Sequence, residues 1–195
     1  LATGSLFGNY HYTALLGVQI GAVPLVIMPM YFVAGYLAWT MGTIFLGNLG
    51  TGMERRNRFL VPFVAASIMV MWDYSLDPII STIHGAWIWE DGGAHFGVPI
   101  SNYLGWYLTV FLICQVFALY LYRFSANERL GQSRVYWNLA PVMYLGLALG
   151  FVLNPFFETA NLEIYGSLAL GAVLTMVFTS VLNIIFVQRL DEACL

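Results

Sequence analysis

The stretch RRNRFLVPFVAASIMVMWDYSLDP, residues 55–78, joins a cluster of arginines to a long apolar run that ends with two aspartates. From Phe59 to Pro78 the run has about the 20 residues that a helix needs to cross a hydrocarbon layer of roughly 30 Å. Arginines beside such a run are typical of the cytoplasmic side of a membrane. The stretch therefore predicts a transmembrane helix that begins on the cytoplasmic side.

The composition of the whole chain indicates a membrane protein. Apolar residues make up 60% and charged residues 9%, with a mean hydropathy of +0.77, which cannot give a water-facing surface. The long apolar runs far exceed the roughly 10 residues of a barrel strand, so we expect helices. The predicted spans are 22–46, 59–78, 103–122, 136–153 and 165–187. The expected fold is an all-α, polytopic transmembrane helical bundle of about five spans.

The arginines give this bundle a topology. All seven cationic side chains are arginines, and they lie in 55–58, in 123–134 and at Arg189. A pair of apolar runs separates each stretch from the next, so two crossings return the chain to the same side. The positive-inside rule makes that side, with the C-terminus, cytoplasmic, and the loops 79–102 and 154–164 fall outside. The expected location is the cytoplasmic membrane or a photosynthetic membrane.

Residues 1–195 are expected to form a single integral membrane domain. The sequence opens on Leu1 and shows no signal peptide, so we expect it to come from a longer gene product that can contribute earlier spans.

Several kinds of site are not predicted. Cys114 lies within a span and Cys194 at the cytoplasmic end, so the two cannot form a disulfide. The net charge is −3 and the topology accounts for the arginines, so nucleic-acid binding is not expected. His11, His84 and His95 match no usual metal-ligand spacing, and their loop positions do not suit a pigment or haem ligand. We therefore expect no metal.

The remaining polar side chains gather on the predicted outer side, and two of them lie within a span. Counted from Phe59, Asp73 is roughly 21 Å into the hydrocarbon layer. Asp77 follows one turn later on the same helix face, before Pro78, where we expect the helix to end or kink. Two carboxylates in a low-dielectric site repel each other, so we expect one to hold its proton at neutral pH. The structural alternative is that Asp77 caps the turn and Asp73 hydrogen-bonds a Ser or Tyr of a neighbouring span.

The outer loop 84–99 contains the features of a folded, interfacial or re-entrant segment. Trp87 and Trp89 are typical of a membrane interface, while Gly92-Gly93 and Gly97-Val98-Pro99 indicate tight turns. Ser101-Asn102 is predicted to cap the third span, with Asn102, Tyr103 and Trp106 pointing roughly the same way. The segment Tyr10-His11-Tyr12-Thr13 lies on the same side and is expected to close the same pocket.

Together these motifs resemble a known family. The matching pieces are Tyr10-His11-Tyr12-Thr13, Gly21-Ala22-Val23-Pro24, Asp73, Leu76-Asp77-Pro78, Trp87-x-Trp89, Gly92-Gly93, Gly97-Val98-Pro99 and Ser101-Asn102-Tyr103-Leu104-Gly105-Trp106. The combination is similar to the membrane carotenoid biosynthesis family that includes hydratases acting on γ-carotene-like and bisanhydrobacterioruberin-like substrates. The resemblance covers about residues 8–122, and the last two spans match by hydropathy only.

The resemblance implies the addition of water to the terminal double bond of an acyclic carotenoid, giving a tertiary alcohol without a cofactor. Asp73 or Asp77 would donate the proton, and Glu90 or His11 would orient the water. Aromatic faces stabilise a carbocation, a role that falls to tryptophans here. The expected substrate-binding residues are Tyr10, His11, Tyr12, Trp72, Trp87, Trp89, Asn102 and Trp106.

Two other functions stay open at this stage. The first is a non-catalytic subunit that holds carotenoid or chlorophyll-type pigment in a photosynthetic or other membrane complex, with partner subunits. The second is a transporter or channel in which Asp73 and Asp77 form a proton or cation site. In every case the lipid bilayer surrounds the protein.

Overall fold

The computed structural model describes residues 6–126, 128 and 130–190, so Arg129 and Cys194 lie outside the described residues. Five helical segments in this part are long and apolar enough to cross a membrane. They are α1 (Ile27–Phe45), α2 (Asn57–Asp77) with its extension η2 (Pro78–Ile83), α3 (Ile100–Phe124), α4 (Arg134–Phe157), and the segment formed by α5 (Leu162–Ala172), η3 (Val173–Val177) and α6 (Phe178–Gln188). The all-α bundle of about five spans is confirmed.

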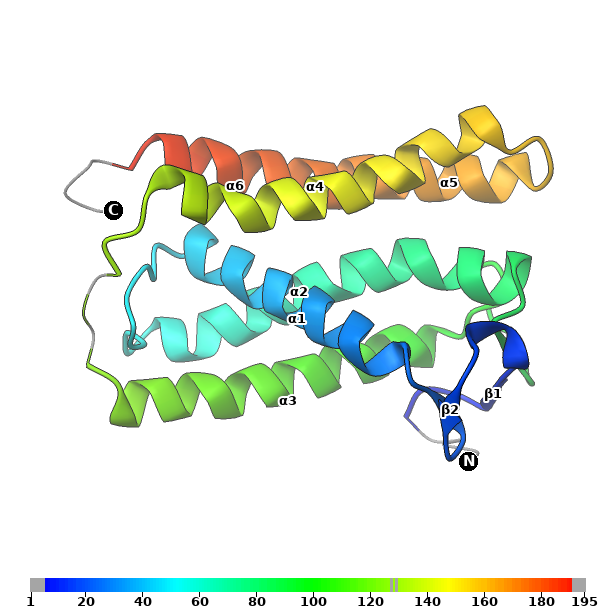
Figure 1. Cartoon of the computed structure of the whole chain (residues 1–195), viewed down its shortest axis with the longest axis horizontal. Coiled ribbons are helices and arrows are strands. Elements are labelled where there is room, and N and C mark those ends of the chain that lie inside the picture. Colours follow the sequence, from blue (N-terminus) through cyan, green and yellow to red (C-terminus); the bar gives the residue numbers. More distant parts are fainter. Residues whose placement is uncertain (1–5, 127, 129, 191–195) are drawn as a thin grey trace.

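The spans form two groups that meet along α1 and α2. In Figure 1, α1, α2 and α3 lie together, and α4 packs with α5 and α6 on the other side. One apolar core joins the groups, and it includes Met69 of α2, Val110 of α3 and Leu168 of α5. The fully buried Tyr144 of α4 donates a hydrogen bond of 2.6 Å to the carbonyl oxygen of Ile68. This bond satisfies a hydroxyl that would otherwise be unpaired in the core and ties α4 to α2.

The described arginines all lie at one end of the bundle. Arg56 precedes α2, Arg123 is in the last turn of α3, Arg134 begins α4, and Arg189 follows α6. This end is on the left in Figure 1, opposite the β-strands. The clustering of charge agrees with the predicted topology, whereas the side of a membrane that this end faces stays a prediction.

The first two spans differ from their predicted limits. Residues 22–24 do not belong to the first helix, because Gly21, with φ +62°, starts a turn between β2 (Gln19–Ile20) and β3 (Val23–Pro24). The second helix does not end at Pro78. It continues as the wider π-helical turn η2, because proline removes one backbone donor and a wider turn accommodates its ring.

The loop after η2, predicted as a folded interfacial or re-entrant segment, contributes a strand. β4 (Trp87–Trp89) pairs antiparallel with β1 (Tyr10–Tyr12), with Tyr10 opposite Trp89 and Tyr12 opposite Trp87. Alternation along a strand places these four aromatic rings on one face, which packs against the start of α1. We call this two-stranded sheet the aromatic cover. It joins the segment before the first span to the loop between the second and third spans.

The cover continues into a tight turn that leads to α3. His95 and Val98 exchange backbone hydrogen bonds of 3.1 and 3.0 Å, which close the turn. Gly93 packs directly on this turn, because a Cβ atom there would lie 2.0 Å from the backbone carbon of Val98. Only glycine fits this close approach.

We expect Gly93→Ala to destabilise the protein by about 3 kcal/mol, because the new methyl group meets backbone that cannot move aside without shifting the turn. Gly35→Ala is the matched control, since a Cβ at Gly35 of α1 meets nothing within 4 Å. Thermal unfolding in detergent should show a lower Tm for the first variant and an unchanged or higher Tm for the control. Equal Tm values for the two variants would contradict this packing.

Candidate functional site

Two aspartates lie inside the bundle at the end opposite the arginines. Asp73 and Asp77 of α2 are 0% and 1% exposed, and their spacing of one turn puts both on the face of α2 turned toward α3. The sequence predicted this shared face. The side chains point to protein neighbours and not to lipid.

Asn102 connects the two carboxyl groups. Its Nδ2 donates to Oδ2 of Asp77 at 2.5 Å and to Oδ2 of Asp73 at 3.3 Å, and the residue is 2% exposed. The primary amide carries two hydrogens, so one side chain can serve both acceptors. The predicted cap of the third span was wrong. α3 begins at Ile100 after the extended residue Pro99, and Asn102 lies inside its first turn, where the buried carboxyl groups are the acceptors within reach.

Tyr31 of α1 completes the polar cluster. Its hydroxyl donates to Oδ1 of Asp73 at 3.4 Å. Its ring stacks on Trp106 with centroids 4.1 Å apart and meets the ring of Trp72 edge-on at 5.8 Å. The sequence analysis allowed a hydrogen bond from Asp73 to a Ser or Tyr of a neighbouring span, but it did not identify Tyr31. Its aromatic character at the end of a span opposite the arginines was the only signal, and several other tyrosines share it.

The two aspartates differ in the hydrogen bonds that their carboxyl oxygens accept. Both carboxyl oxygens of Asp73 accept hydrogen bonds, whereas Oδ1 of Asp77 is buried and has no partner among the described residues. Asp77 does not cap η2 with its side chain, and its backbone carbonyl accepts a bond of 2.7 Å from the hydroxyl of Ser81. The described residues pair neither aspartate with a cation. Two buried negative charges without a counter-ion are very unfavourable, so the arrangement favours a proton on the pair.

The aromatic cover lies next to this cluster. Tyr31, which bonds Asp73, also packs in the group that contains Tyr12 and Trp87. The rings of Tyr12 and Trp87 are 5.9 Å apart, and those of Tyr10 and Trp89 are 4.9 Å apart. Burial raises the pKa of Tyr12 well above its usual value, and Tyr10 and the two aspartates add in the same direction. Tyr12 therefore keeps its phenolic proton.

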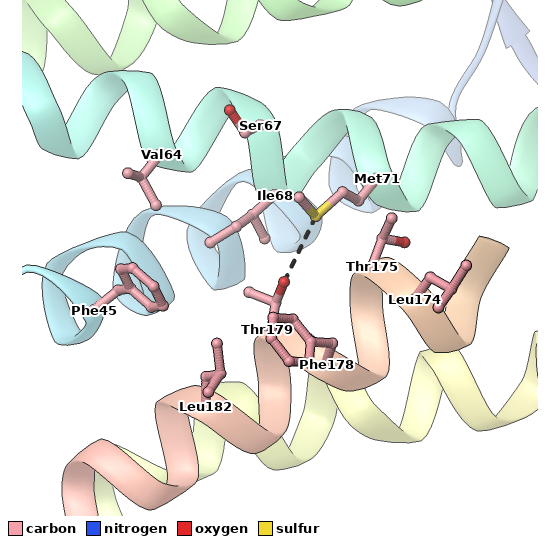
Figure 2. A pocket seen from close by; sticks show the side chains of 10 residues that line it. All are labelled: Phe45, Val64, Ser67, Ile68, Met71, Leu174, Thr175, Phe178, Thr179 and Leu182. Carbon is pink, nitrogen blue, oxygen red and sulfur yellow. Dashed lines mark hydrogen bonds between the residues drawn. The ribbon is translucent and has the colours of Figure 1, made fainter.

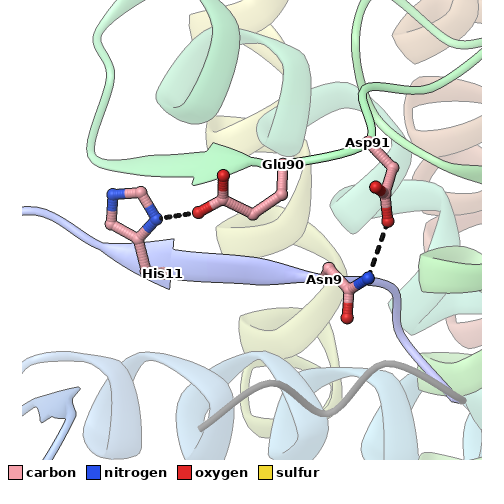
Figure 3. A network of polar contacts seen from close by, with 4 residues as sticks. All are labelled: Asn9, His11, Glu90 and Asp91. Carbon is pink, nitrogen blue, oxygen red and sulfur yellow. Dashed lines mark hydrogen bonds and ion pairs between the residues drawn. The ribbon is translucent and has the colours of Figure 1, made fainter.

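Glu90 and His11 lie on the opposite face of the cover. Nδ1 of His11 is 2.5 Å from Oε1 of Glu90, and the two side chains are 57% and 55% exposed (Figure 3). Beside them, Asn9 donates a hydrogen bond of 2.7 Å to Asp91. These contacts join the two segments of the cover. The structure does not bring the predicted water-orienting residues Glu90 and His11 to the aspartate pair, because alternate residues of a strand face opposite ways.

The other predicted residues divide between the cluster and its cover. Trp72, Trp106 and Asn102 lie in the cluster with the aspartates, and Tyr10, Tyr12, Trp87 and Trp89 form the inner face of the cover. Within the described residues, no group of three or more His, Cys, Asp or Glu side chains is arranged to hold a metal ion.

A groove of about 250 Å³ runs along the other side of α2, between α1 and α2 on one wall and η3 and α6 on the other (Figure 2). Its lining is mostly apolar and includes Val64, Ile68, Phe178 and Leu182. A single polar contact crosses it, from the hydroxyl of Thr179 to the sulfur of Met71 at 3.7 Å. The groove is therefore suited to an apolar ligand, and it does not open onto the carboxyl groups, which face α3.

Comparison with known proteins gives one match. A family model described as carotenoid biosynthesis protein matches residues 1–182. No curated protein and no solved structure matches the chain. Since the family model covers most of the sequence, this chain belongs to the carotenoid biosynthesis protein family.

Proposed function

We propose that this protein is a carotenoid hydratase, which adds water to the terminal double bond of an acyclic carotenoid end group. The observation that carries the proposal is the buried pair of Asp73 and Asp77, which share one amide donor and have no cation partner in the described part of the chain. Membership of the family supplies the class of substrate.

The reaction needs an acid, a shielded cation and water. The carboxyl O–H gives its proton to the less substituted carbon of the double bond, and the π electrons form the new C–H bond. The other carbon becomes a tertiary cation, which the oxygen of a water molecule attacks. That water then returns a proton to the carboxylate, so the acid is restored and no redox cofactor is consumed.

We assign the acid to Asp77. Its Oδ1 has no hydrogen-bond partner among the described residues, so a proton there is free to be transferred. Asp73 instead accepts bonds at both oxygens, from Tyr31 and from Asn102, which suits a carboxylate that keeps its charge. A fixed negative charge beside Asp77 makes its proton harder to lose to water and keeps it in place until substrate binds.

Aromatic rings lie beside the aspartate pair and suit the cationic intermediate. Tyr31, which bonds Asp73, packs on both Trp72 and Trp106, and π faces in a desolvated site attract positive charge. On this proposal Glu90 and His11 hold the cover together and take no direct part in the chemistry. The arginine end faces the cytoplasm, so the acid lies near the opposite surface of the membrane.

We expect Asp77→Asn to lower hydratase activity at least 100-fold, because an amide cannot supply the proton, and general acids contribute about 10²–10⁴-fold. Asp73→Asn should cause a smaller loss. The measurement is the hydroxylated carotenoid formed, by mass analysis, in a host that accumulates an acyclic carotenoid. Glu163→Gln, a change at an exposed carboxylate in the first turn of α5, is the control. Full activity in both aspartate variants would refute the assignment.

The source of the new hydroxyl gives a second test. Hydration in water enriched in ¹⁸O should place one heavy oxygen in each product molecule, because the attacking nucleophile is solvent water. An oxygenase would instead take its oxygen from O₂, and the product would then stay unlabelled in the same medium. Mass spectrometry of the product in the two isotopic conditions separates the two reactions.

The apolar groove favours a second candidate, a non-catalytic subunit that holds a carotenoid. Thr175 of η3 lines the groove, and Thr175→Phe would fill it. On this candidate the variant should purify with less carotenoid, whereas Asp77→Asn should retain it. Leu170→Phe, at an exposed position outside the groove lining, is the control. Pigment recovery measured by absorbance decides the question, and unchanged pigment in Thr175→Phe counts against a carotenoid in this groove.

A further inference from the structure

The carbonyl group of Tyr74 lacks its usual helical partner. In an α-helix this oxygen would accept a hydrogen bond from the backbone N–H four residues later, but that residue is Pro78, which has none. Tyr74 lies on α2 between Asp73 and Asp77, so the break in the hydrogen-bond ladder falls next to both carboxyl groups.

His95 supplies the missing donor. Its Nε2 lies 3.2 Å from the carbonyl oxygen of Tyr74, and its ring stacks on the Tyr74 ring with centroids 3.8 Å apart and an angle of 24°. A carbonyl oxygen can only accept, so Nε2 must carry the hydrogen. Burial lowers the pKa of His95, although the Tyr74 carbonyl acts in the opposite direction, so the neutral ring protonated at Nε2 is the form that fits.

The turn that holds His95 is a compact unit anchored to the second span. The hydroxyl of Thr82 in η2 donates to the carbonyl oxygen of Phe96 at 2.6 Å. The paired backbone bonds between His95 and Val98 close the turn, and Gly93 packs on it. The unit is thus fixed to α2 at Tyr74 and to η2 at Thr82.

The same turn determines where α3 begins. The backbone N–H of Asn102 donates to the carbonyl oxygen of Pro99 at 3.0 Å, directly after the turn. Asn102 then directs its amide at the two aspartates. A chain of contacts therefore runs from Tyr74 through His95 and the turn to Asn102, and returns to α2 at the carboxyl groups.

We propose that His95 is a positioning residue, which replaces the hydrogen bond lost at Pro78 and thereby holds the Asn102 amide on Asp73 and Asp77. Its effect on catalysis rests on the proposed hydratase function, whereas its effect on the geometry of the carboxyl groups does not. His95 itself need not touch the substrate.

Three variants separate the hydrogen bond from the ring. His95→Phe keeps an aromatic ring over Tyr74 and removes the donor. His95→Gln keeps an N–H donor and removes the ring. The double variant Pro78→Ala with His95→Phe returns a backbone N–H to the helix, so the Tyr74 carbonyl regains a donor from within α2. Pro78→Ala alone provides the reference for the double variant.

Two quantities are measured for each variant. One is kcat for hydroxylated carotenoid, per folded molecule after size exclusion. The other is the rate at which a hydrophobic carbodiimide labels Asp73 and Asp77 in detergent, located by peptide mass spectrometry. For His95→Phe we expect kcat to fall about tenfold and labelling to rise about tenfold, the scale of one hydrogen bond. His95→Gln should have a kcat and a labelling rate close to those of the wild type. The double variant should have values close to those of Pro78→Ala.

Wild-type kcat and labelling in His95→Phe would overturn the proposal, as would a double variant that resembles His95→Phe. If His95→Phe does not fold, the comparison of His95→Gln with wild type still decides: faster labelling in His95→Gln would show that the donor is not sufficient. Failure of the hydratase proposal would look different. The wild-type protein would then form no hydroxylated product, while the labelling rates of the variants would still differ in the expected order.

Discussion

The structure depends on keeping two carboxyl groups out of water in a part of the protein that contains no cation among the described residues. Isolated charges are very costly there, so the groups need hydrogen-bond donors and a shared proton. The described donors come from two other helices, the amide of Asn102 in α3 and the hydroxyl of Tyr31 in α1. The close packing of α1, α2 and α3 at this end is therefore required by the chemistry of the pair as well as by apolar contact.

The aromatic cover serves the same requirement from outside the bundle. Tyr10, Tyr12, Trp87 and Trp89 close the end at which a carboxyl group would otherwise meet water, while the polar contacts of the cover stay on its outward face. A carboxyl group shielded from water keeps its proton until substrate is in place, and no bulk water then competes with the alkene for that proton. Exclusion of water is unfavourable for the charged form of the aspartates, but it suits the proposed reaction.

The sequence predicted those features that depend on neighbours along the chain. The apolar runs gave five spans, the arginine stretches gave one charged end, and the spacing of Asp73 and Asp77 gave a shared helix face. Contacts between distant segments were not predictable, because no local pattern selects Tyr31 from the other tyrosines or pairs Tyr10 with Trp89.

Local rules also failed where a stronger partner competed. Asn102 was expected to cap a helix, but its side-chain amide donates hydrogen bonds to the buried carboxyl groups instead. Pro78 was expected to end or kink the helix, and the chain continues past it as a wider turn.

The pairing of β1 with β4 has a consequence for biosynthesis. β1 is made before α1 and α2, but its partner strand is made only after both helices are complete. The edge of β1 therefore has no partner strand while the two helices insert into the bilayer. Closure of the sheet is then a late step that requires both helices to have crossed. A chain in which only one of the two helices crossed would leave the two strands on opposite sides of the membrane, and it could never seal the end of the bundle.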